Sequence, residues 1–192
     1  MRSVISRNAL LAGVCFLFTS HGWAQSPAPP PHAIDLAVNY SPLNANLVAG
    51  SRFWMQGGSA QAGVGLVSHW SLVADISGAH TANMASSGIG LDLLLLTAGP
   101  QYSLHVRRVQ FFGQGRAGFG WGHNSLFPTR STSSTSGIGA AVALGGGVDL
   151  SLSRRFDLRV AELEWDRTEL NNLNANAQNS IRLSTGIVVH LR

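Results

Sequence analysis

GQGRAGFGWG, residues 113–122, is the stretch that decides the fold of this 192-residue chain. Its first six residues satisfy the pattern G-x-G-x-x-G, the glycine fingerprint of a dinucleotide-binding turn. That fingerprint needs a strand before it and a helix that starts within it, so that the helix N-terminus meets the pyrophosphate. The residues after Gly118 continue instead to alternate glycine with Phe119 and Trp121, which is the period of a β-strand. The stretch therefore predicts a closely packed strand and not a nucleotide site.

The same period of two recurs along most of the chain, and no helix-length amphipathic segment accompanies it. Apolar residues alternate with small or polar residues in eight segments, at 34–40, 54–66, 72–77, 89–95, 111–121, 138–150, 161–165 and 181–191. The predicted links are short at 67–70, 103–108 and 151–155, and longer at 41–52, 80–87, 124–136 and 166–179. An even number of strands with alternating short and long links is typical of an outer-membrane barrel.

The composition indicates what the two faces of these strands meet. Only 11% of the residues are charged, against about 25% in ordinary soluble domains, and lysine is absent. The polar face carries Gly, Ala, Ser and Gln, which suits the narrow interior of an eight-stranded barrel. The apolar face can meet lipid once closure has removed the sheet edges. We therefore predict an all-β fold, an eight-stranded antiparallel up-and-down transmembrane β-barrel.

The N-terminal residues predict export. Arg2 and Arg7 precede a short apolar run at 9–18, and Gly22-Trp23-Ala24 offers small residues where a signal peptidase cleaves. The run is shorter than the roughly 20 residues of a membrane-spanning helix. We expect a signal peptide at 1–24, a Pro-rich leader at 25–32 and the barrel at 33–192.

Removal of the signal peptide settles two further expectations. The single cysteine, Cys15, belongs to the apolar run, so the mature chain has no disulfide or thiol chemistry. The mature net charge falls from +4 to about +2 when Arg2 and Arg7 leave. The chain has no basic stripe with interleaved aromatic residues, so we predict no nucleic-acid partner.

Ionisable residues on the polar face predict a network inside the barrel, because an isolated charge in a narrow interior is costly to desolvate. The expected lumen residues are Asp35, Asp75, Asp92, Arg116, Asp149, Glu162, Glu164 and Arg182. We interpret them as a structural polar network, with a proton or ion pathway as the alternative. Glu162 and Glu164 could also form an acid/base pair, but their strand spacing beside arginines favours the structural interpretation.

The segment His123-Asn124-Ser125 raises an enzymatic alternative, because it is similar to the His and Ser of lipid A deacylases with an eight-stranded barrel fold. Those enzymes continue with Asn-Ala, whereas Leu126-Phe127-Pro128 follows here, and the next strand offers no Glu at 137–140. Without a third group the histidine is not oriented as a base. The remaining histidines are scattered, so we predict no catalytic residue, no metal site and no cofactor.

Four segments of the mature chain resemble the OmpA/OmpX-like family of small outer-membrane barrels, and the resemblance covers residues 33–191. The segments are 99–103 (GPQYS), 144–149 (LGGGVD), 159–165 and 182–191 (RLSTGIVVHL). The last is similar to the C-terminal strand signal read by the barrel-assembly machinery, although the family usually ends in Phe or Trp and this chain ends Leu191-Arg192. No peptidoglycan-binding domain is expected after the barrel. These motifs are diffuse and specify architecture more than activity.

The sequence thus predicts a monomeric, integral outer-membrane protein with a structural or surface-interaction role and no enzymatic activity. The expected partners are outer-membrane lipid and lipopolysaccharide, with the barrel-assembly machinery and periplasmic chaperones during biogenesis. The alternatives are a lipid A deacylase-like enzyme, a small pore, or a secreted soluble sandwich or ligand-binding barrel.

Overall fold

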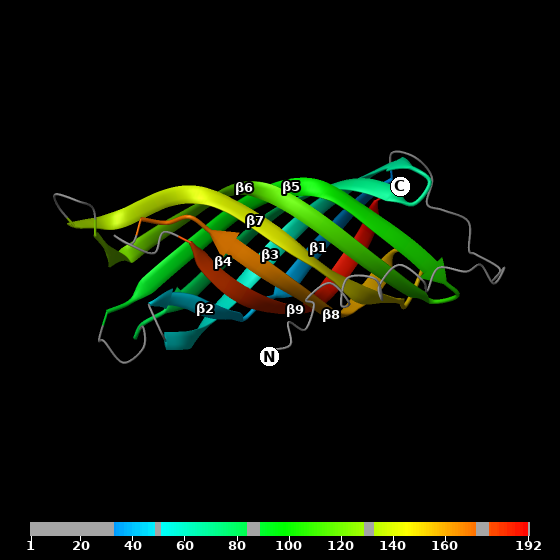
Figure 1. Ribbon diagram of the computed structural model, residues 1–192. Coiled ribbons are helices and arrows are strands. Elements are labelled where there is room, and N and C mark those ends of the chain that lie inside the picture. Colours follow the sequence, from blue (N-terminus) through cyan, green and yellow to red (C-terminus); the bar gives the residue numbers. More distant parts are fainter. Residues whose placement is uncertain (1–32, 49–50, 84–88, 129–132, 172–176, 192) are drawn as a thin grey trace, which may run out of the picture.

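The computed structural model describes residues 33–48, 51–83, 89–128, 133–171 and 177–191, and these residues form one antiparallel sheet that closes on itself (Figure 1). The strands are β1 (Ile34–Tyr40), β2 (Leu43–Val48), β3 (Ser51–Val67), β4 (Trp70–Thr81), β5 (Leu91–Val106), β6 (Val109–Pro128), β7 (Ser133–Ser151), β8 (Phe156–Thr168) and β9 (Gln178–Leu191). The predicted signal peptide at 1–24 and the leader at 25–32 lie outside the described residues.

The first barrel strand is interrupted. Both β1 and β2 pair with β3 and β9, and Ser41 and Pro42 separate the two halves. Proline cannot donate a backbone hydrogen bond, so the ladder breaks there, although the Pro42 carbonyl still accepts from the Leu183 amide at 3.1 Å. The ring therefore has eight strands, each antiparallel to its neighbours, and the predicted up-and-down barrel is confirmed.

The two ends of the barrel differ. At one end, called here the turn end, short connections lie at 68–69, 107–108 and 152–155. At the opposite loop end, β6 and β7 are the longest strands, with 20 and 19 residues. The longer links predicted at 41–52 and 124–136 are wrong over most of their length, because strand pairing continues through Ser, Thr and Asn residues whose composition indicated loops.

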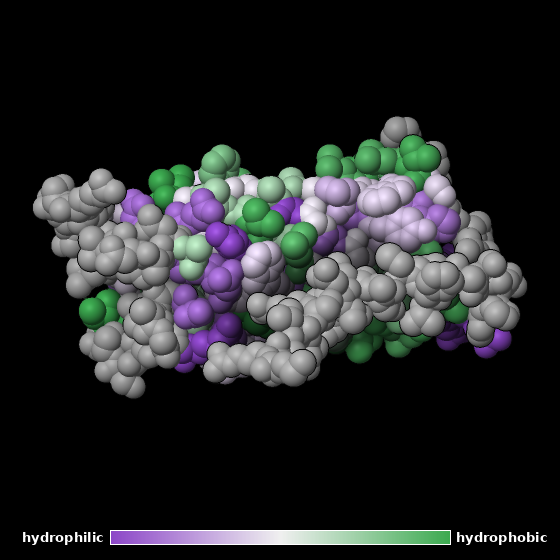
Figure 2. All heavy atoms as spheres, viewed as in Figure 1, coloured by the Kyte–Doolittle hydropathy of each residue, from purple (hydrophilic) through white to green (hydrophobic). Residues whose placement is uncertain are grey.

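Apolar side chains point outward around the barrel, and Figure 2 shows many of them on the face in view, beside a group of polar side chains. Along β4, for example, Leu72 and Ile76 are exposed whereas Val73, Asp75 and Ser77 are buried. This alternation follows from the pleat of a strand, which sends successive side chains to opposite faces. None of the described residues forms a helix long and apolar enough to cross a membrane.

Candidate functional site

The interior of the barrel holds a buried cluster of eight charged side chains, called here the charged network. Its members are Asp75, Arg116, Asp149, Arg159, Glu162, Glu164, Asp166 and Arg182. They come from β4, β6, β7, β8 and β9, so the network connects strands on different sides of the ring. Three guanidinium groups face five carboxyl groups, and every one of the eight side chains has an oppositely charged neighbour within 4 Å.

Arg182 is the centre of one half of the network. Its guanidinium lies 2.5 Å from Glu164 Oε2, 3.2 Å from Asp166 Oδ2 and 3.3 Å from Asp75 Oδ1. Arg116 lies on the other side of Glu164, with Nη2 2.5 Å from Oε1. Glu164 therefore bridges two arginines from β6 and β9, and all these groups are almost fully enclosed by protein.

Arg159 organises the other half. Its Nε and Nη2 donate to the two oxygens of Asp149 at 3.0 and 3.2 Å, which is the bidentate geometry that a guanidinium favours. Its Nη1 lies 3.0 Å from Glu162 Oε2, and Gln114 donates to both Glu162 and Glu164. Gln114 thus joins the two halves into one network.

Glycines of β7 make room for these side chains. A Cβ atom on Gly147 would lie 2.5 Å from the Ala161 carbonyl oxygen and 2.7 Å from Phe112 Cζ. The Phe112 ring in turn lies against Arg159, whose guanidinium carbon is 4.6 Å from the ring centroid. The small residues of the segment 144–149 therefore allow an aromatic ring and a guanidinium to stack inside a narrow barrel.

The loop-end half of the interior is apolar. Buried side chains from β2, β3, β5, β6 and β7 pack together there, with Leu170 from the link after β8. This apolar plug consists of Leu43, Ala45, Phe53, Met55, Leu91, Leu93, Leu95, Phe127, Ala141 and Leu170. The Phe127 ring occupies the space over Gly122 and Gly137, where a Cβ on either glycine would collide with it or crowd it. These buried side chains fill much of the loop-end half of the lumen.

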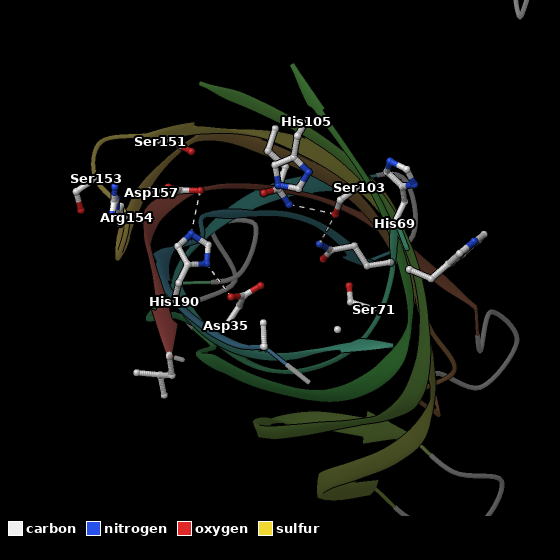
Figure 3. Close-up of a pocket in the computed structure, with 16 residues that line it drawn as sticks. Asp35, His69, Ser71, Ser103, His105, Ser151, Ser153, Arg154, Asp157 and His190 are labelled. Atoms are coloured by element: carbon white, nitrogen blue, oxygen red, sulfur yellow. Dashed lines mark hydrogen bonds and ion pairs between the residues drawn. The ribbon is translucent and has the colours of Figure 1, made fainter. Parts of the chain in front are cut away.

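The turn end holds a polar cavity of about 360 Å³ that opens to the outside. Figure 3 shows His190 between Asp157 and Asp35 on one side of it, with Ser103 and His105 on the other. His190 Nδ1 lies 2.7 Å from Asp35 Oδ1, and Nε2 lies 3.1 Å from Asp157 Oδ2. An imidazole can donate from both nitrogens only when it is protonated, so this geometry holds an imidazolium between two carboxylates.

The structure distributes the eight expected lumen residues over three places. Six of them, Asp75, Arg116, Asp149, Glu162, Glu164 and Arg182, lie in the charged network. Asp35 lies in the mouth of the cavity. Asp92 lies on the outer face of β5, where its side chain is 38% exposed and contacts His80 Nδ1 at 2.5 Å, so its placement in the lumen was wrong.

The physical reason for that error is the apolar plug. Leu91, Leu93 and Leu95 point inward to build it, and the alternate residues Asp92, Leu94 and Leu96 therefore point outward. The rule that the polar residues of a barrel strand face the lumen fails where the lumen itself is apolar.

Four further ionisable residues lie inside the barrel: Asp157, Arg159, Asp166 and His190. In the first part of β8 the apolar residues stand at even positions (156, 158 and 160), and Asp157 and Arg159 lie between them. In the second part the apolar residues stand at odd positions (161, 163 and 165), so the two alternating runs are out of phase. A β-bulge between Arg159 and Glu162 resolves the conflict, because Val160 and Ala161 both point outward. Recognition of two alternating runs out of phase would have found Asp157 and Arg159, whereas Asp166 simply continues the alternation of Glu162 and Glu164.

The His123–Ser125 pair does not form a catalytic arrangement. Residues two apart on a regular strand share a face, but a register irregularity between His123 and Phe127 intervenes, and Asn124 has a φ of 58°. His123 is exposed, whereas Ser125 is buried. The described residues also contain no group of three His, Cys, Asp or Glu side chains placed to hold a metal ion.

Solved structures match this closed eight-stranded arrangement over most of the chain. The attachment invasion locus protein Ail of Yersinia pestis has a TM-score of 0.57 at 13% identity, over 84% of this chain and 100% of its own. This chain has the fold of the small outer-membrane β-barrels. Neisserial surface protein A (NspA) matches this barrel fold with a TM-score of 0.57 at 13% identity, over 82% of this chain and 95% of its own.

A third outer-membrane barrel, OprG of Pseudomonas aeruginosa, has a TM-score of 0.53 at 10% identity, over 86% of this chain and 98% of its own. No family model matches the sequence. No curated protein matches it either. At these identities the likeness defines the outer-membrane barrel fold alone.

Proposed function

We propose that this chain is an integral outer-membrane β-barrel with a structural or surface-interaction role and no enzymatic activity. The observation that carries the proposal is the outward apolar surface of a ring without free edges. Leu36, Phe119, Ile138 and Ile187 are exposed on different strands, and side chains of this kind are stable in contact with lipid. A closed barrel satisfies its backbone hydrogen bonds internally, as a membrane requires.

The interior supports a barrel that does not conduct ions. A permeating ion would need a wet path past both the charged network and the apolar plug. The network is held by short ion pairs, and the plug contains large buried side chains such as Phe53, Met55 and Phe127. No feature of the described interior supports the alternative of a small pore as these ion pairs and buried side chains support a closed lumen.

The loop end supports a role at the surface. The β6–β7 hairpin carries the longest strands and projects beyond its neighbours at one end of the barrel (Figure 1). We infer that this hairpin is the part of the molecule that meets extracellular partners or lipopolysaccharide. The name of the structural neighbour Ail refers to attachment and invasion, which is a role of this class.

The proposal includes the route to the membrane. The signal peptide at 1–24 directs export and is removed, periplasmic chaperones carry the unfolded chain, and the barrel-assembly machinery inserts it as a monomer. The strand signal at 182–191 is the segment that we expect this machinery to bind.

The decisive test is refolding of the mature chain from urea into detergent micelles, followed by electrophoresis with and without boiling. A closed barrel keeps its hydrogen-bonded ring in the gel detergent and migrates differently until it is heated. We expect that shift, no conductance in planar bilayers, and recovery of the expressed protein in the outer-membrane fraction. A chain that stays monomeric and soluble in plain buffer, with no heat-dependent shift, would contradict the proposal and favour a secreted sandwich.

A further inference from the structure

The turn end of the barrel carries a concentration of positive charge. Arg107 and Arg108 form the β5–β6 turn, and Arg154 and Arg155 lie in the β7–β8 link. All four side chains are exposed, and the end of β7 contacts the β5–β6 turn, because the Ser151 amide donates to the Arg108 carbonyl at 2.7 Å. These four residues are called here the arginine rim.

The rim has no counter-charge of its own. Among the described residues, no carboxylate lies within 4 Å of any of the four guanidinium groups. Three carboxylates lie toward the turn end, but His190 contacts Asp35 and Asp157, and Arg159 contacts Asp149. At the loop end, by contrast, Arg167 lies 3.8 Å from Glu169. The rim is therefore free to bind an external anion.

Turn geometry does not account for one of these arginines, Arg107. Arg107 has a φ of 57°, which is a left-handed backbone conformation that glycine and asparagine adopt at lower cost. A residue with a large side chain at such a position points to a requirement for the side chain itself. Arg107 thus places a guanidinium where the backbone alone would favour a smaller residue.

The surroundings of the rim define the kind of anion. Val106, Phe111, Leu152 and Phe156 adjoin the arginines and are exposed apolar residues on the outside of the barrel. In the membrane orientation of the proposed function, these residues lie at the level where acyl chains give way to headgroups, and Arg154 also lines the mouth of the turn-end cavity. Arginine recognises phosphate through a planar, bidentate fork.

We propose that the arginine rim binds the phosphate groups of anionic phospholipids in the leaflet that surrounds the turn end. This inference rests on the proposed insertion of the barrel in a membrane. The rim would fix the depth of the barrel in the bilayer and collect anionic lipid around it, since basic residues near an anionic surface attract its lipids.

The test uses the mature protein in vesicles of phosphatidylcholine and phosphatidylglycerol. The reporter is a single tryptophan next to the rim, made by F156W in a chain with W54F, W70F, W121F and W165F. A brominated lipid quenches the fluorescence of this tryptophan when the lipid lies beside it. The ratio of quenching by brominated phosphatidylglycerol to quenching by brominated phosphatidylcholine gives the relative association constant of the two lipids. The rim variant is R107N/R108Q/R154Q/R155Q, and the control is R52Q/R167Q, which removes arginines from the loop end.

We expect the reporter protein and its control to prefer phosphatidylglycerol by about fivefold, an advantage that salt reduces. The rim variant is expected to lose this preference. No preference in the reporter protein, or an unchanged preference in the rim variant, would overturn the inference. Failure of the proposed function is distinguishable, because a protein that does not insert shows no heat-dependent gel shift and no quenching by either lipid.

Discussion

Arg159 Nη1 lies 3.0 Å from Glu162 Oε2, although residues three apart on a regular strand point to opposite faces. The bulge at Val160 and Ala161 brings the two side chains to the same side. The Thr185 hydroxyl donates to the Arg159 carbonyl at 2.9 Å and so occupies a backbone acceptor beside the bulge. One extra residue in β8 thus places five ionisable side chains inside the barrel, two before it and three after it.

Deletion of Ala161 is expected to prevent formation of the closed barrel. With one residue fewer, the strand regains strict alternation, and either the two ionisable side chains before the bulge or the three after it must then face outward into lipid. Burial of such charges without partners is too costly for the barrel to tolerate. The measurement is the heat-dependent gel shift after refolding in micelles.

Ala161→Val is the matched control for that deletion, because the Ala161 side chain is exposed on the outer face. This variant keeps the bulge and should refold like the natural chain. A deletion variant that retains the gel shift in full would show that the bulge is not needed to place the charged network.

Arg182→Gln is expected to lower the free energy of unfolding by about 3–5 kcal/mol, because it leaves buried carboxylates without their shared cation. Three carboxyl groups, of Asp75, Glu164 and Asp166, contact Arg182. In the variant Arg116 still contacts the first two, and Asp166 loses its arginine partner. The free energy can be measured from urea unfolding in vesicles. The control is Arg167→Gln, whose exposed pair with Glu169 should contribute less than about 1 kcal/mol. Equal effects at the two positions would contradict a structural role for the charged network.

The sequence was sufficient to predict the closed ring of strands and many of the residues inside it, because alternation with a period of two shows which face of a strand each side chain lies on. At three places the sequence did not predict which side chains point inward, because contacts with neighbouring strands change the alternation there. Because of the bulge in β8, the inward orientation of Asp157 and Arg159 was not predicted. The irregularity at Asn124 places His123 and Ser125 in different environments. The apolar plug takes the inward positions of β5, so Asp92 points outward. Each of these depends on what the neighbouring strands place opposite, and alternation within one strand does not carry that information.

Gly147→Ala is expected to destabilise the barrel by about 1–3 kcal/mol, because the added methyl group would meet the Ala161 carbonyl and the Phe112 ring. The ring could move only by giving up its contact with Arg159. Urea unfolding in vesicles measures the change. Gly113→Ala is the control on the adjacent strand, where the added methyl group would have only an ordinary contact at 3.9 Å. A loss at Gly113 as large as at Gly147 would contradict the packing argument.

His190→Gln is expected to weaken the seam at which the first and last strands meet. His190 on β9 contacts Asp35 on β1 and Asp157 on β8, so one side chain ties the last strand to both of its neighbours. A glutamine amide can donate to one carboxylate but presents an oxygen to the other. We expect the free energy of unfolding to fall by about 1–3 kcal/mol, the range for hydrogen bonds to charged groups.

The pH dependence of this loss separates the ion pairs of His190 from simple packing. The two carboxylates stabilise the protonated ring, so its contribution is complete in mildly acidic buffer and is lost as rising pH removes the imidazolium proton. The stability difference between the natural chain and His190→Gln should therefore shrink in strongly alkaline buffer. His80→Gln is the control, since the His80–Asp92 pair is exposed on the outer face and should contribute little to stability. A difference that stays constant or grows with pH would show that His190 stabilises the seam by packing alone.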